Sequence, residues 1–260
     1  NKLKGDFIMA TIKGANSAAA GYEIEASCDF NQADSDHMTN TPASNGNQRI
    51  WTFSAWVKVD SDNDARTIFH IGTWPAEPWT LIAVHDTDKI LFRSYYSGAD
   101  YLYLSNTTFD EDGTWNHLVI AVDTTQGTDT NRVKMYKNGT QLTSFQIHDK
   151  VAQNYDTGAN QSNLEHQLGE EGGLGRYFNG VMSEVYMIDG EQLAPTAFAE
   201  NDGGTWTAIE YTGDFGTAGF YLDFKDASDL GNDVSGNGEH FAEVNIVSGN
   251  QITSGLPPFK

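Results

Sequence analysis

Four segments between Ile50 and Gly190 each combine a β-rich body with a bounding Gly, Asn or Asp, and they constrain the fold more than any other feature. They are IWTFSAWVKVD (50–60), GTWNHLVIAVD (113–123), RVKMYKNGTQL (132–142) and YFNGVMSEVYMIDG (177–190). Short runs of this kind, ending at turn-forming residues, are typical of antiparallel strands and hairpins. Similar runs lie at 66–72, 79–85, 89–96 and 100–105. The pattern predicts an all-β protein.

The first of these segments has a clear period of two. One face would carry apolar side chains and the other face mostly polar ones, apart from Trp56. We therefore expect a strand with one face in the core and one face half-exposed to water. The core-facing residues would be Trp51, Phe53, Ala55, Val57 and Val59.

Two further local predictions concern a hairpin and a helix. Both central residues of a type I′ turn need a positive φ, which Asn138 and Gly139 tolerate, so we expect a hairpin there. The segment EQLAPTAFAE (191–200) is the only plausible helix, a short one with Pro195 in its first turn.

Composition limits the classes of partner. The chain has 260 residues and a formal net charge of −21, which would repel nucleic acid. No apolar run approaches the roughly 20 residues of a membrane-spanning helix, so membrane insertion is not expected. Cys28 is the only cysteine, which rules out an internal disulfide. The chain begins at Asn1 rather than Met, which leaves open whether residues precede it.

Taken in order, the four segments resemble the laminin-G-like, concanavalin A-like jelly-roll family. The resemblance implies a two-sheet antiparallel β-sandwich that mostly binds sugars or other proteins. We expect an N-terminal arm at 1–21 and one jelly-roll domain at 22–260, with the segment 201–260 contributing a strand to the same sandwich.

The segment 201–260 suggests an unusual strand order. In this family, an aromatic strand such as GFYLDF (219–224), followed by a turn such as DVSGNG (233–238), is usually met at the start of the domain. Here the pair follows the last expected strand. We therefore expect a circularly permuted jelly roll, the alternative being a second module that begins near residue 218.

The sequence does not predict an enzyme. Glycoside hydrolases of this fold place their acids on one strand as E-x-D-x-x-E, and no such run is present. Glu184 and Asp189 are an odd number of residues apart, which predicts opposite faces of the strand. The resemblance makes Glu184 a structural position and His117 a packed strand histidine.

One turn predicts a calcium site. Asp233, Ser235 and Asn237 offer oxygen ligands at alternate positions before Gly238, like the first half of a calcium loop. Asp229 is the candidate for a further ligand, with Asp226 or Glu239 as substitutes. The alternative is a turn whose side chains bond only their own backbone. The acidic loops at 60–64 and 110–113 are weaker cation candidates.

An aromatic cluster is the candidate ligand site. Sugars stack on exposed aromatic rings, and neighbouring carboxylates bind their hydroxyls. The same rings also suit a subunit interface, or they simply pack in the core, as Tyr101 and Tyr103 would on one shared face. The candidate residues are Trp74, Glu77, Trp79, Tyr95, Tyr96 and Asp100.

Several segments of the sequence are similar to those of laminin-G-like proteins of tailed, especially marine, phages. The similarity lies in residues 18–58, 120–145, 178–200 and 211–224. It implies a non-enzymatic protein of the virion surface, a capsid decoration or tail-fibre module, with copies of itself or virion proteins as neighbours and a host-surface glycan as ligand. The alternatives are a free lectin or adhesin module of a secreted or cell-surface protein, and a polysaccharide-degrading enzyme.

Overall fold

The computed structural model describes residues 22–60, 66–109 and 113–260. The expected N-terminal arm (1–21) and most of both acidic loops lie outside these ranges. Among the residues described, no helix has the length and apolarity needed to span a bilayer.

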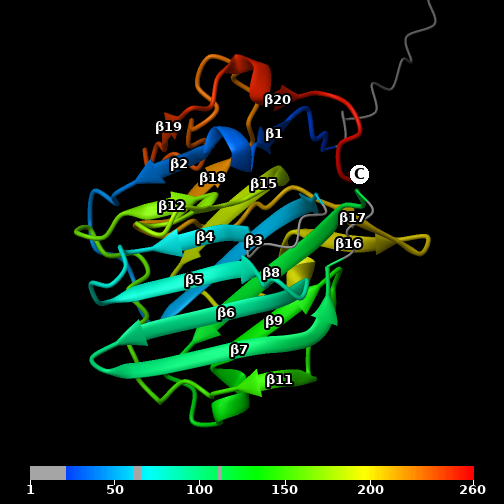
Figure 1. Ribbon diagram of the computed structural model, residues 1–260. Coiled ribbons are helices and arrows are strands. Elements are labelled where there is room, and N and C mark those ends of the chain that lie inside the picture. Colours follow the sequence, from blue (N-terminus) through cyan, green and yellow to red (C-terminus); the bar gives the residue numbers. More distant parts are fainter. Residues whose placement is uncertain (1–21, 61–65, 110–112) are drawn as a thin grey trace, which may run out of the picture.

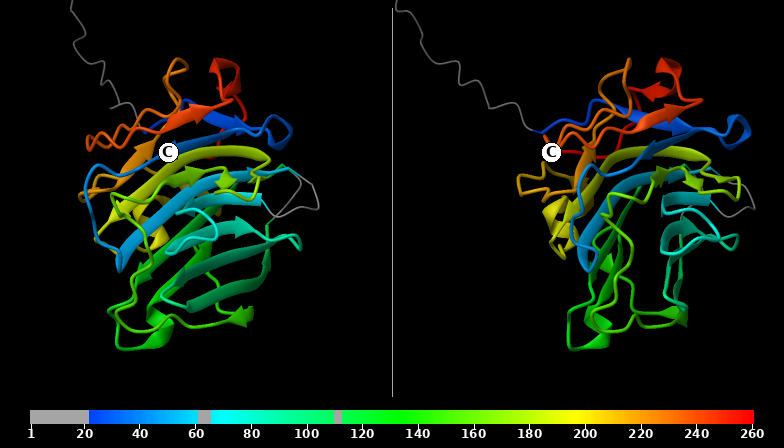
Figure 2. Two further views of the ribbon diagram at one scale, coloured as in Figure 1. Left: turned by 60° about the vertical axis from the view of Figure 1, so that its left-hand side comes forward. Right: turned by 90° about the vertical axis from the view of Figure 1, so that its left-hand side faces the viewer.

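Two large antiparallel sheets face each other and enclose the core, as the resemblance implies (Figure 1; the two layers are seen edge-on at the right of Figure 2). The front sheet of Figure 1 contains, in spatial order, β11 (Phe145–His148), β7 (Ala99–Thr108), β6 (Lys89–Tyr96), β5 (Trp79–Val84), β4 (Arg66–Ile71), β12 (His166–Leu168), β2 (His37–Asn40) and β19 (Ala242–Val244). The back sheet contains β10 (Thr140–Gln141), β9 (Val133–Lys137), β8 (Asn116–Asp123), β3 (Ile50–Val59), β15 (Gly180–Asp189), β1 (Ser27–Phe30) and β20 (Gln251–Ile252), while β18 (Phe220–Leu222) also pairs with β15.

Small elements decorate this sandwich. They are the hairpins β13–β14 (Glu170–Glu171 and Arg176–Tyr177) and β16–β17 (Ala199–Asp202 and Thr205–Ala208), and the 3₁₀ turns η1 (Gln32–Asp34), η2 (Asp129–Asn131), η3 (Pro195–Ala197) and η4 (Ser248–Asn250).

The predicted helix at 191–200 is wrong except for its centre, which forms the single 3₁₀ turn η3 with Pro195 as its first residue. The chain is extended again from Ala199, because β16 pairs with β17 through Ala199 and Ala208. Phe198, just before this strand, is buried against Tyr186. Tertiary packing therefore overrides the local helix preference.

In strand β3 the prediction of a core-facing side is confirmed, whereas the prediction of a half-exposed opposite side is wrong. All five residues expected in the core are fully buried there. The opposite face is not half-exposed: Thr52, Ser54 and Trp56 are buried as well. Trp56 packs in a second cluster with Ala199 and Ala208, so residues far along the chain cover this face.

The predicted hairpin at Asn138-Gly139 is confirmed. These residues have φ of 47° and 77°, and they join β9 to β10 with Lys137 opposite Thr140. Both positive φ values match the type I′ turn that the sequence predicts.

Strands from both ends of the described chain lie along one edge of β15. β1 pairs with Gly180–Met182, and β18 pairs with Val185–Met187. β20 in turn pairs with β1. The segment after residue 201 thus adds strands to the sheet that contains Ser27–Phe30. Circular permutation remains our interpretation of this arrangement.

Between these two pairings β15 contains a bulge. Its register against β3 shifts between Ser183 and Tyr186, and Glu184 has a φ of 51°. The extra residue allows β15 to pass from one edge partner, β1, to the next, β18.

Candidate functional site

The outer face of the front sheet is apolar where β5 and β6 lie side by side. Alternation along β5 directs Thr80 and Ile82 into the sandwich and leaves Trp79, Leu81 and Ala83 on the outside. These three residues form a separate cluster with Leu91 and Tyr95 of β6. This cluster lies outside the sandwich core, but its β5 residues are themselves buried, at 3–7% exposure, so a ligand could reach only the exposed groups beside it.

Trp74, Trp79 and Tyr95 form an aromatic ladder on this face. The register places Trp79 opposite Tyr95, and their rings stack at 5.7 Å and 22°. Trp74, from the loop before β5, meets Trp79 edge-on at 5.6 Å. Trp79 is only 3% exposed, whereas Trp74 is 44% exposed. Trp79 therefore supports the ladder, and Trp74 presents a ring to solvent.

An ion pair lies beside the ladder. The guanidinium carbon of Arg93 is 5.1 Å from the ring centre of Trp79, a cation–π contact. Its Nε and Nη2 atoms donate hydrogen bonds of 2.8 and 2.5 Å to the two carboxylate oxygens of Asp100. These hydrogen bonds raise the pKa of Arg93. The site thus combines aromatic faces with a fixed guanidinium and a carboxylate.

A groove of about 460 Å³ continues along the sheet from Arg93. Glu171 and Arg176 of the β13–β14 hairpin form one side and are joined by an ion pair of 3.1 Å. The floor consists of aliphatic side chains, including Leu81, Leu91, Leu102 and Leu104. A ligand on the ladder would therefore extend over an apolar floor with charged groups at its edge.

The structure brings four of the six predicted ligand residues together: Trp74, Trp79, Tyr95 and Asp100. Glu77 has a supporting position, because its carboxylate accepts the backbone N–H of Gly98 at 3.2 Å and ties the Trp74 loop to the β6–β7 turn. Tyr96 points to the other side of β6, where its ring is 6.5 Å from that of Tyr155.

Neighbouring tyrosines belong to the core. Tyr103 is buried, and Tyr101 packs against the core and against Tyr155 at 4.9 Å. The alternative that these two residues simply pack is therefore correct. The sequence analysis missed Arg93, which lies at the same strand parity as Tyr95 and could have been found by that alternation.

In the turn proposed to bind calcium, the polar side chains form hydrogen bonds with nearby backbone groups. The Asp233 carboxylate accepts backbone N–H groups of Tyr221, Ser235 and Glu239, each at 2.9 Å. The Asn237 amide donates to the carbonyl groups of Gly216 and Gly219. Asp229 is exposed near the surface. In the described ranges no three His, Cys, Asp or Glu side chains are arranged to hold a metal ion. Calcium binding at this turn stays a prediction.

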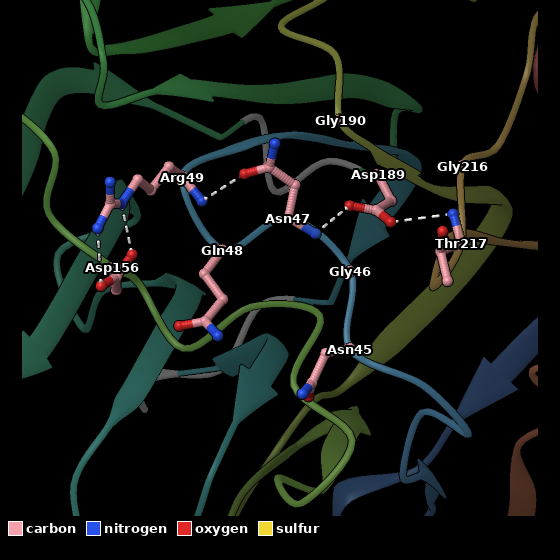
Figure 3. A pocket seen from close by; sticks show the side chains of 10 residues that line it. All are labelled: Asn45, Gly46, Asn47, Gln48, Arg49, Asp156, Asp189, Gly190, Gly216 and Thr217. Carbon is pink, nitrogen blue, oxygen red and sulfur yellow. Dashed lines mark hydrogen bonds and ion pairs between the residues drawn. The ribbon is translucent and has the colours of Figure 1, made fainter.

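A polar pocket of about 620 Å³ lies at one end of the sandwich (Figure 3). Asp189, at the end of β15, accepts hydrogen bonds from the backbone of Asn47 at 2.6 Å and Thr217 at 3.0 Å, and from the Asn160 amide at 3.1 Å. Arg49 and Asp156 form an ion pair of 2.6 Å on another wall. Asp189 is occupied in joining three loops, which gives it a structural role.

Glu184 and Asp189 lie on opposite faces of β15, as their spacing predicts. Asp189 lies in the polar pocket, while Glu184 accepts the hydroxyls of Tyr186 and Tyr221 at 2.7 Å on the outside of the back sheet. The two carboxylates therefore do not flank a common cleft, the arrangement that glycoside hydrolysis needs.

His117 is a packed histidine, also as predicted. Its Nε2 atom is 2.8 Å from the Ser54 hydroxyl, and its Nδ1 atom accepts from the Trp206 indole at 3.0 Å. Burial lowers its pKa to about 3, so the ring is neutral at physiological pH.

Comparison with solved structures agrees with the sandwich architecture. A candidate carbohydrate-binding protein from Bacteroides ovatus is similar with a TM-score of 0.59 and 18% identity, over 91% of this chain and 62% of that protein. This chain thus spans 62% of that protein's length. At 18% identity the likeness shows the fold.

Weaker similarities have TM-scores below one half. They are a heptameric pentraxin from Limulus polyphemus (0.49, 16% identity, 66% of this chain and 80% of that one) and tailspike protein 2 of an Escherichia coli bacteriophage (0.44, 11% identity, 70% and 26%).

Family membership follows from a direct sequence match. No functionally curated protein matches the sequence significantly. A family model described as the concanavalin A-like lectin/glucanases superfamily, laminin G type 3, matches residues 32–194, which is more than half of the chain. The chain belongs to this family of concanavalin A-like lectins and glucanases.

Proposed function

We propose that this chain is a non-enzymatic carbohydrate-binding module whose ligand stacks on the aromatic ladder. The observation that carries the proposal is the solvent-exposed Trp74 ring, which meets Trp79 edge-on while Trp79 in turn contacts Arg93 of the fixed Arg93–Asp100 pair. The flat C–H face of a sugar ring suits an indole, and the guanidinium and carboxylate provide a donor and an acceptor for hydroxyl groups. The candidate carbohydrate-binding protein from Bacteroides ovatus shares this fold, which supports the same ligand class.

The absence of catalysis is part of the proposal. Supporting it, Glu184 and Asp189 lie on opposite faces of β15 and are both engaged by hydrogen bonds. A reducing-end assay on bacterial and algal polysaccharides tests this point. We expect no release of reducing ends, and release that depends on either acid would identify an enzyme.

The first experiment is a broad glycan array with the full chain, once in calcium and once in EDTA. We expect binding to a defined class of glycan. Binding lost in EDTA would support calcium at or near the site, and binding in both buffers would support the module without calcium in recognition. Absence of binding in both buffers would overturn the proposal.

A matched pair of variants then tests whether the glycan binds at the aromatic ladder. Trp74 and Tyr96 are exposed to similar extents, 44% and 38%, but lie on different sides of the sheet. Trp74→Ala should weaken glycan binding about tenfold or more, the effect of removing a central aromatic contact. Tyr96→Ala should leave the affinity unchanged. Equal losses in both variants would argue against the ladder.

For the biological setting, we propose a protein of the virion surface, a capsid decoration or tail-fibre module that attaches to host glycans. The support is the sequence similarity to laminin-G-like proteins of tailed phages. This setting requires assembly contacts, so the full chain should sediment as a stable oligomer. A monodisperse monomer would favour the alternative of a free lectin or adhesin module.

A further inference from the structure

A third cavity, of about 510 Å³, lies on the outside of the back sheet and has aromatic walls. We call it the tyrosine cavity. The ring of Tyr186 stacks on Tyr221 at 4.2 Å and 12°, and Phe215 is almost parallel to Tyr221 at 6.3 Å. Tyr211 meets Phe215 edge-on at 5.3 Å, and Tyr22 completes the wall. The cavity thus presents several aromatic faces and edges to whatever enters it.

Acidic side chains surround this aromatic wall. Glu23, Glu25, Glu210 and Asp223 line the cavity, and Lys225 is the one basic residue among its lining residues. The Lys225 ammonium lies 3.3 Å from Glu25 and 3.9 Å from Asp223. Within the described part of the chain, Glu23 and Glu210 form no ion pair. Two exposed carboxylates therefore stay without a cationic partner at an aromatic cavity.

A third, independent observation is the buried acid Glu184 behind the same tyrosines. Glu184 is 2% exposed, and its Oε2 atom accepts the hydroxyls of Tyr22, Tyr186 and Tyr221. Its Oε1 atom is buried and has no hydrogen-bond partner among the described residues. A buried, incompletely satisfied carboxyl group at a positive φ is costly, and such features concentrate at binding sites.

The three hydrogen bonds to Glu184 also change the electron density of the tyrosine rings. A phenol that donates to a carboxylate gains electron density at its oxygen and in its ring, so the ring face becomes more negative. Cations are attracted to such faces, and the attraction grows when water is excluded. In its ionised form Glu184 therefore favours a positive group in the cavity, although it lies behind the wall.

We propose that the tyrosine cavity binds an organic ammonium group, with its charge against the tyrosine faces and near Glu23 and Glu210. Val234, an apolar residue that lines the cavity and is 42% exposed, offers a surface for the carbon substituents of the ligand. The ammonium group belongs either to a quaternary, choline-like ligand or to a primary amine such as that of lysine. This site lies on the opposite sheet from the aromatic ladder and is independent of it.

The experiment is titration calorimetry of the full chain with three probes: choline, n-butylammonium and 3,3-dimethyl-1-butanol. The last probe has the shape of choline but no charge. We expect at least one cation to bind about tenfold or more tightly than the neutral probe, as a cation–π contact with nearby carboxylates implies. Tighter binding of choline identifies a quaternary ligand, and tighter binding of n-butylammonium identifies a primary amine. Equal binding of cations and the neutral alcohol, or no binding of any probe, would overturn the proposal.

Two variants and one control variant test whether the cation binds in the tyrosine cavity. Tyr211→Leu keeps an apolar side chain but removes an aromatic face, and it should weaken cation binding about fivefold or more. Glu23 is exposed, so Glu23→Gln should not affect folding. This variant should weaken cation binding and reduce the salt dependence of that binding. Tyr96→Leu, at an exposed tyrosine of the front sheet that lies outside the ladder, should leave cation affinity unchanged. If Tyr96→Leu lowers the affinity as much as Tyr211→Leu, or if Glu23→Gln has no effect, the assignment is wrong.

Discussion

Asp100 holds the guanidinium of Arg93 from the neighbouring strand, with one hydrogen bond to Nε and one to Nη2. The two residues are diagonal neighbours, because Arg93 lies opposite Leu102 and Asp100 lies opposite Tyr95. The planar, two-bonded geometry keeps the guanidinium beside Trp79 before any ligand arrives. A ligand that uses Arg93 would therefore not have to order a flexible side chain.

The first prediction concerns this pair. Asp100→Ala should lower the affinity for the glycan found on the array about threefold to tenfold, because Arg93 loses its fixed orientation and the ligand loses an acceptor. The free energy of unfolding should change by less than about 1 kcal/mol, since both side chains are partly exposed. Calorimetry and urea denaturation measure the two effects. A large loss of stability with unchanged affinity would make the pair purely structural.

The second prediction separates the two tryptophans of the ladder. Trp79→Ala should reduce the free energy of unfolding by about 3 kcal/mol or more, because a large buried side chain leaves a cavity between Tyr95, Trp74 and the sheet. Trp74→Ala should cost less than about 1 kcal/mol, since its ring is largely at the surface. Denaturation curves of both variants check this contrast. Similar losses would show that Trp74 is also a packing residue.

The third prediction uses the pKa of Glu184, which burial raises above the ordinary value of 4.5, with a contribution from Asp223. The folded protein then binds more protons than the unfolded chain between the two pKa values. The free energy of unfolding should therefore fall as the pH rises from 4.5 toward the folded-state pKa.

Glu184→Gln keeps the shape of the side chain and removes this titration. Its stability relative to the parent protein should increase as the pH rises through that window, by about 1.4 kcal/mol for each unit by which folding raises the pKa. Urea denaturation at a series of pH values gives the comparison. Parallel stability profiles for the two proteins would mean that Glu184 keeps its ordinary pKa.

The fourth prediction distinguishes the two interpretations of the Asp233 turn. In calcium-free buffer, Asp233→Ala should lower the free energy of unfolding by about 2–4 kcal/mol, because three backbone N–H groups lose their acceptor. If calcium binds this turn, millimolar calcium should raise the melting temperature of the parent protein but not that of Asp233→Ala. A calcium-induced increase that persists in the variant would locate the ion elsewhere.

Local patterns were sufficient for much of the fold. The period of two in β3 identifies its core face, and Asn138-Gly139 identifies a hairpin, because both signals depend on neighbouring residues only. The opposite face of β3 could not be predicted in the same way. The residues that pack on this face, Ala199 and Ala208, lie more than 100 positions further along the chain.

The candidate site was predicted in part for the same reason. Trp74, Trp79 and Tyr95 are close in sequence, so their clustering is visible before folding. Tyr96 was grouped with them although adjacent strand residues point to opposite faces. The partners of Glu184 were beyond sequence reasoning, because Tyr22 and Tyr221 are separated from it by 162 and 37 positions and meet it only through the sheet.

The division of the β15 edge between β1 and β18 has a consequence for biosynthesis. Residues Gly180–Asp189 leave the ribosome before the segment Phe220–Leu222 that pairs with their second half, and before Gln251–Ile252, which pairs with β1. A growing chain therefore carries an incompletely paired β15 until residues 220–222 have emerged, and an incompletely paired β1 until residues 251–252 have emerged. Exposed strand edges of this kind promote association between chains. Synthesis rate and chaperone access during that interval should therefore govern how much of this protein reaches its folded state.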